Sequence, residues 1–209
     1  MLFHLIEDLI RNISGGLGRS IRRAYYKFRL GKLGKNCNID QGVYFQSPKD
    51  IFIGNDSWID KRSIFIAGKL DRKNVKRLKS NITEAVVEGQ IHIGPNAHIG
   101  PGTVIQGHGG VRIASYFASS TYSNFYSLTN NVRSLHCVVG GQDKDYILTP
   151  IFIGSNVLFG LNATMIGGKV GDNCFIKPYS MLTGNFSDNT IIGGNPAKEI
   201  DSRYRDLKA

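Results

Sequence analysis

The chain has 209 residues, of which 41% are hydrophobic and 25 are glycine, a composition that fits one β-rich domain with terminal additions. No apolar run approaches the roughly 18 residues of a membrane-spanning helix, and acidic residues near the start argue against an export signal. The net charge of +10 permits nucleic-acid binding, but no nucleic-acid-binding motif accompanies it. We therefore expect a cytoplasmic protein with no nucleic-acid partner.

Residues 1–34 are predicted to form an N-terminal helical segment. Apolar residues recur at helical spacing from Leu2 to Ile13, and Gly15-Gly16 interrupts the pattern before a basic, aromatic-containing stretch at 19–30. Two compatible interpretations stay open. The segment caps the next domain or packs on a neighbouring subunit, or it contacts the anionic cytoplasmic face of the inner membrane as a basic, amphipathic patch.

Residues 35–203 carry an apolar residue at every sixth position over most of their length. These positions include Ile53, Ile59, Ile93, Ile99, Ile105, Ile153, Phe159, Met165, Val170, Ile176 and Leu182. A six-residue period fits neither an amphipathic helix nor a half-buried strand, and it is typical of a parallel β-helix. Three hexapeptides make one triangular coil, so we expect each inward residue to stack on its equivalent about eighteen residues later. Small residues are expected where backbones crowd at the corners.

Two segments interrupt this repeat. We interpret residues 68–90, which are rich in Lys and Arg, as a solvated loop or short helix, with attraction of an anionic substrate as the alternative. Residues 132–149 form a second loop. The repeat is degenerate and aromatic over 113–131, and residues 106–110 are interpreted as a local two-residue bulge. Residues 204–209 form a short C-terminal tail.

The cysteines and histidines predict no metal site. The chain has 3 cysteines, without metal-ligand spacing, and Cys174 falls at a small corner position. Because His92 and His98 are six positions apart, they lie on different faces of a coil. We expect His98 to face solvent and Cys137, beside His136, not to act as a nucleophile.

Three stretches make the chain resemble the hexapeptide-repeat acyltransferases, in particular the sugar O-acetyltransferases of capsule and O-antigen clusters. They are residues 107–113, 153–163 and 191–200, the last being very similar to the family's closing glycine-asparagine-proline-alanine-basic motif. The resemblance implies an all-β fold, a left-handed parallel β-helix assembled as a homotrimer. It also implies metal-free transfer of acetyl from acetyl-CoA to a carbohydrate acceptor, a sugar hydroxyl of a surface polysaccharide or its precursor.

In that family a histidine removes the proton of the sugar hydroxyl, a task suited to an imidazole with a pKa of about 6.5. This chain departs from the pattern, because Asn130 and Asn131 stand where the histidine is expected. The first candidate for the base is His136 in the same loop, and the second is His108, which occupies an acceptor-contacting position in related enzymes. A third alternative is an altered or lost activity in which Asn131 only polarises the acceptor. The predicted substrate contacts are Asn130, Asn131 and Gly100.

For acetyl-CoA, the resemblance gives four candidate contacts. Leu161 and Pro178 match positions that line the pantetheine groove, Thr183 matches a family threonine, and Lys198 in the closing motif is the candidate for the nucleotide phosphates. Two other functions stay open. One is N-acetylation of an amino sugar nucleotide, and the other is a non-catalytic β-helix that serves in assembly.

Overall fold

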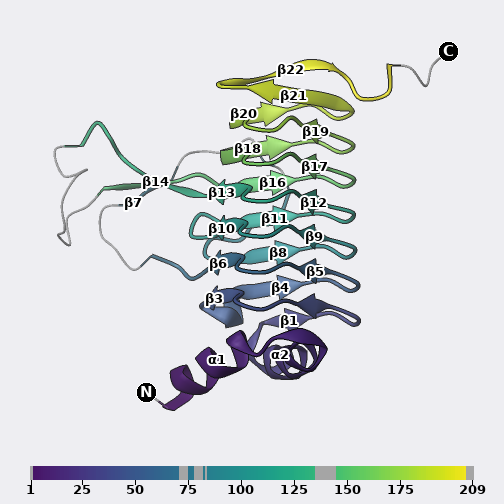
Figure 1. Ribbon diagram of the computed structural model, residues 1–209. Coiled ribbons are helices and arrows are strands. Elements are labelled where there is room, and N and C mark those ends of the chain that lie inside the picture. The colour runs from purple at the N-terminus through teal and green to yellow at the C-terminus, as the bar shows by residue number, and fades with distance from the viewer. Residues whose placement is uncertain (1, 71–74, 78–81, 83, 135–144, 206–209) are drawn as a thin grey trace.

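The computed structural model describes residues 2–70, 75–77, 82, 84–134 and 145–205, and side chains from residue 5 onward. The chain winds into a column of stacked coils with two helices at its N-terminal end (Figure 1). Each coil contributes one short strand to each of three faces, and strands of successive coils pair in parallel. The fold is therefore a parallel β-solenoid, as the six-residue period predicts.

The three faces are named in the order in which the chain meets them. The first face contains β1 (Lys32–Leu33), β4 (Ile51–Ile53), β8 (Ile91–Ile93), β11 (Val111–Ile113) and β16 (Ile151–Ile153). The second contains β2 (Asn38–Ile39), β5 (Trp58–Ile59), β9 (His98–Ile99), β12 (Ala118–Ser119), β17 (Leu158–Phe159), β19 (Phe175–Ile176) and β21 (Thr190–Gly194). The third contains β3 (Tyr44–Gln46), β6 (Ile64–Ile66), β10 (Val104–Gln106) and β13 (Asn124–Tyr126). Two longer strands, β18 (Thr164–Val170) and β20 (Met181–Phe186), run from the third face onto the first.

The coils are longer than eighteen residues in the N-terminal half and shorter near the end. Lys32 pairs with Phe52, an offset of 20, whereas Leu158 pairs with Phe175, an offset of 17. The prediction of an eighteen-residue stack is therefore wrong. The additional residues lie at the corner between the third and first faces, so the stretch 106–110 is no local bulge but the ordinary length of this corner. The same corner includes the 3-10 turn Pro48–Asp50 in the first coil.

The core is a column of inward aliphatic and aromatic side chains, and the corners pack backbone on backbone. A Cβ on Gly54 would lie 2.4 Å from the backbone nitrogen of Pro95 in the next coil, which explains the recurrent glycine after the inward residue. Other corner positions are left-handed asparagines that bond along the column, as Asn156 Nδ2 donates to Asn173 Oδ1 at 2.9 Å. Cys174 is fully buried, as its corner position predicts.

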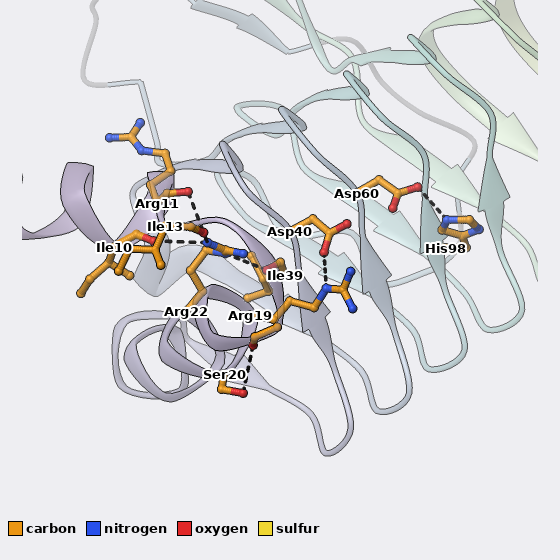
Figure 2. Close-up of polar contacts among 11 residues, drawn as sticks. Ile10, Arg11, Ile13, Arg19, Ser20, Arg22, Ile39, Asp40, Asp60 and His98 are labelled. Carbon is orange, nitrogen blue, oxygen red and sulfur yellow. Dashed lines mark hydrogen bonds and ion pairs between the residues drawn. The ribbon is translucent and has the colours of Figure 1, made fainter.

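The N-terminal helices α1 (Leu2–Asn12) and α2 (Gly15–Arg29) cover the first coil, in agreement with the cap interpretation. Arg22 is buried between α1, α2 and β2, and its Nη1 donates to the carbonyls of Ile13 at 2.5 Å and Ile10 at 3.3 Å (Figure 2). Its Nε donates to the Ile39 carbonyl at 2.8 Å. Burial lowers the pKa of Arg22. Arg22 therefore donates to carbonyls at the end of α1 that lack intrahelical donors, and it links α1 to the first coil.

Both interruptions of the repeat emerge at the corner between the third and first faces. Strand β14 (Leu128–Asn130) pairs antiparallel with β15 (Tyr146–Leu148), and β15 pairs in parallel with β7 (Val75–Arg77). These strands form a small sheet beside the column (Figure 1). The described part of 68–90 thus contains a strand where a loop or short helix was expected.

The C-terminal end is closed by the hairpin that joins β21 to β22 (Ala197–Ser202), which pairs antiparallel with it. The column begins at Lys32, three residues before the expected boundary at 35. No helix in the described part of the chain is long and apolar enough to span a membrane.

Candidate functional site

A hollow of about 550 Å³ lies at the corner where both interruptions leave the column. Its wall is built from the base of the first interruption, the corner turn after β10 and the paired strands β14 and β15. The lining residues are Leu70, Gln106, His108, Leu128, Thr129, Asn130 and Tyr146. Three successive passages of the chain through one corner therefore converge on one site.

The side chain of His108, in this wall, is oriented by a hydrogen bond to the backbone. Its Nδ1 lies 2.8 Å from the carbonyl oxygen of Gly68, and the residue is 8% exposed. Since a carbonyl only accepts, Nδ1 carries a proton in this contact, and in the neutral imidazole the lone pair is on Nε2. The backbone holds the residue as well, because Gly89 N donates to the His108 carbonyl at 3.0 Å. The imidazole is therefore presented as a proton acceptor.

The turn that carries His108 is held by Ser127, which is fully buried in the next coil. Ser127 Oγ donates to the Gln106 carbonyl at 2.6 Å and accepts from Gly109 N at 2.9 Å. Gly110 has a φ of +90°, and a Cβ there would lie 2.6 Å from the Val87 carbonyl oxygen. Sequence reasoning missed Ser127, although a twenty-residue stack places it directly on Gly107.

Among the predicted acceptor contacts, the structure brings Asn130 together with His108. Asn130 ends β14 and lines the same hollow as His108. Asn131 begins the next turn, where its backbone N–H donates to the Asp145 carbonyl at 2.9 Å and its Oδ1 accepts from Arg133 N at 3.3 Å. His136 and Cys137 lie outside the described residues.

Gly100 lies at a different corner, between the second and third faces. Its backbone N–H donates to Ser119 Oγ at 3.0 Å, and a Cβ there would lie 2.4 Å from the Ser119 carbonyl oxygen. Close packing of successive coils therefore accounts for this glycine, and within one chain it does not meet the hollow.

The predicted acetyl-CoA contacts are spread over the C-terminal half of the column. Leu161 and Pro178 occupy the corner between the second and third faces, in neighbouring coils. Thr183 lies at the same corner as His108 but three coils further on, roughly 14 Å along the column at about 4.8 Å a coil. Lys198 is exposed on β22. The four residues form no single pocket among the described ones.

Two other histidines lie on the faces of the column. His98 is exposed, as predicted, and its Nε2 lies 2.8 Å from Asp60 Oδ2 (Figure 2). His92 stacks on Phe52 with ring centroids 4.4 Å apart. Burial lowers the pKa of His92, and the positive charge of Arg112 lowers it further. Within the described residues, no group of three or more His, Cys, Asp or Glu side chains is placed to hold a metal ion.

Comparison with known proteins agrees with the coils seen here. Residues 150–177 match the model of the family described as hexapeptide repeat of succinyl-transferase. This stretch of the chain therefore carries a hexapeptide repeat. Its fold is similar to that of AntD, an N-acyltransferase from Bacillus cereus, with a TM-score of 0.71, 20% identity and coverage of 90% of this chain and 91% of that one. AntD has been solved with dTDP-4-amino-4,6-dideoxyglucose and coenzyme A.

Two curated relatives are similar in sequence. The bifunctional protein GlmU of Listeria monocytogenes is 27% identical over 179 residues, which is 77% of this chain and 37% of GlmU. Protein CapG of Staphylococcus aureus is 47% identical over 53 residues, 25% of this chain and 31% of CapG. The chain therefore spans well under half the length of these relatives.

Proposed function

We propose that this protein transfers an acetyl group from acetyl-CoA to a sugar hydroxyl of a surface polysaccharide or its precursor. The observation that carries the proposal is His108, which lines a hollow of about 550 Å³ and whose Nδ1 is hydrogen-bonded to the Gly68 carbonyl at 2.8 Å. The likeness to AntD, solved with coenzyme A, supports an acyl-CoA donor. The three motifs shared with sugar O-acetyltransferases support the hydroxyl acceptor.

The reaction requires a base because a sugar hydroxyl is a weak nucleophile at neutral pH. His108 Nε2 accepts the hydroxyl proton while the oxygen attacks the thioester carbonyl, and a tetrahedral oxyanion forms. Collapse of this intermediate breaks the carbon–sulfur bond. The thiolate of coenzyme A then takes the proton from His108, which leaves the ester on the sugar and restores the neutral imidazole. Asn130 contacts the acceptor from the facing strand.

The second candidate function is N-acylation of an amino sugar nucleotide, which the likeness to AntD favours. The test is to incubate the full chain with acetyl-CoA and, separately, a purified polysaccharide and a dTDP-linked amino sugar. Alkaline hydroxylamine cleaves an oxygen ester but leaves an amide intact. A hydroxylamine-labile acetyl group on the polysaccharide supports the first proposal. A stable amide on the nucleotide sugar replaces it with the second, and no transfer to either acceptor favours the assembly role.

The proposal includes a left-handed coil and a homotrimer, with the donor bound between neighbouring columns. Three-fold packing would place Leu161 and Pro178 of one chain near the hollow of the next, a contact that the single column does not make. We expect light scattering to give about three times the 23.1 kDa of one chain. A mass of one chain at micromolar concentration would contradict this assembly.

Lys198 is proposed to contact the phosphates of acetyl-CoA. It is exposed on β22 and faces no ion-pair partner among the described residues. Lys198→Ala is expected to raise the KM for acetyl-CoA several-fold with a smaller effect on kcat, because a contact distant from the thioester contributes equally to ground and transition states. Lys35→Ala, a control at an exposed lysine in the first coil, should leave this KM unchanged. An unchanged KM in the Lys198 variant would exclude the contact.

A further inference from the structure

The helices at the N-terminal end use one side to cover the first coil and leave an apolar stripe on the other. α2 buries Gly18, Arg22 and Tyr26, which are spaced four residues apart and face the coil. At 100° a residue, Leu17 and Phe28 lie on the opposite side. They are 72% and 77% exposed, so the outer face of α2 presents large apolar side chains to solvent.

The orientation of α1 adds to this surface. Its Glu7 faces α2, where the carboxylate accepts hydrogen bonds from Tyr25 and Tyr26, both at 3.3 Å. Leu5 and Leu9, one helical turn apart, are 58% and 63% exposed. An amphipathic helix of a globular protein ordinarily buries its apolar side, whereas α1 packs through a polar residue and turns its leucines outward. We call Leu5, Leu9, Leu17 and Phe28 the apolar end surface.

The charges of α2 have one sign, and the exposed acid of α1, Asp8, is paired with Arg11. α2 contains five Lys or Arg residues and no acidic residue. Two of the arginines point back toward the column, Arg22 at the carbonyls of α1 and Arg19 at Asp40, 2.7 Å away (Figure 2). Arg23 and Lys27 remain exposed beside the apolar end surface. A second copy of α2 packed here would bring like charges together, so the complementary partner is an apolar surface with negative charge.

We propose that the apolar end surface docks on an anionic lipid bilayer. The leucines and Phe28 enter the boundary between head groups and acyl chains, and Arg23 and Lys27 contact the lipid phosphates. The helices lie at the end of the column, whereas the small sheet that builds the His108 hollow lies at its side (Figure 1). The bilayer would therefore hold the column upright with the hollow clear of it. This inference is independent of which acceptor is acetylated.

The test is co-sedimentation of the full chain with vesicles of pure phosphatidylcholine or of phosphatidylcholine mixed with phosphatidylglycerol. We expect binding to the anionic vesicles that weakens as salt is added. Lys27→Ala should lower the partition coefficient about fivefold, which corresponds to about 1 kcal/mol for one basic residue. Phe28→Glu should lower it about tenfold or more, because it removes an apolar contact and adds a negative charge.

The matched control is Tyr116→Asp, which also replaces an exposed aromatic, 64% accessible, with an acid, but on the side of the column. This variant should bind vesicles like the original chain. Equal binding to both kinds of vesicle, or unchanged binding by Phe28→Glu, would overturn the proposal. A third outcome would also overturn it: the original chain does not bind vesicles, and Phe28→Glu changes the mass measured by light scattering. The apolar end surface would then be a contact between copies of this chain.

Discussion

Replacing His108 with asparagine is expected to lower kcat by about 10²–10⁴-fold, the range that general-base catalysis supplies. The asparagine amide can take the place of Nδ1–H and donate to the Gly68 carbonyl, which lies 2.8 Å from Nδ1 in the histidine. Nothing replaces the Nε2 lone pair, however. The variant therefore keeps the turn and loses the base, and steady-state release of coenzyme A at saturating substrates measures the loss.

Two comparisons make this result specific. His98→Ala, at an exposed histidine on the second face, should retain near-normal turnover. Thermal unfolding of His108→Asn should match the original chain, since the hydrogen bond to Gly68 is retained. A folded His108→Asn variant with normal kcat would exclude His108 as the base.

Arg22→Met is expected to lower the free energy of unfolding by about 2–4 kcal/mol. The substitution retains much of the apolar volume but leaves the carbonyls of Ile10, Ile13 and Ile39 without their donor. An unsatisfied buried polar group costs about 1–3 kcal/mol, and relief of the buried charge offsets part of the sum. Urea denaturation at a fixed chain concentration measures the change, because any oligomer links stability to concentration.

Arg23→Met provides the matched control, one residue further along α2. Arg23 is exposed, so its substitution should change the free energy of unfolding by no more than about 0.5 kcal/mol. Equal stabilities of the two variants would mean that the cap does not depend on the buried arginine.

Much of the fold could be predicted from the sequence because every coil repeats the same pattern of inward apolar residues. Inward residues such as Ile93 and Ile99 recur every six positions, and each is buried. The length of the corner between the third and first faces could not be predicted from this pattern. The number of residues in this corner varies from coil to coil while the strands stay in register. The repeat was also interpreted as degenerate and aromatic over residues 113–131. In the structure it forms strands of an ordinary coil, with Phe117 and Phe125 in the core.

The site was harder to predict than the fold. The motif around His108 is visible in the sequence, but the partner of its Nδ1 is a backbone carbonyl forty residues earlier, which no side-chain pattern indicates. The meeting of His108 with Asn130 depends on the twenty-residue register. The role of Arg22 was equally hard to predict, because Arg22 is one of several basic residues in α2 and only packing distinguishes it from Arg23.

The most direct test of the central claim compares His108→Asn with His136→Ala, since His136, outside the described residues, is the other candidate for the base. Turnover of both variants is measured at saturating acetyl-CoA and acceptor. The account predicts that His108→Asn loses about 10²–10⁴-fold in kcat while His136→Ala stays within a few-fold of the original chain. Near-normal turnover of His108→Asn beside an inactive His136→Ala would contradict it and assign the base to the loop.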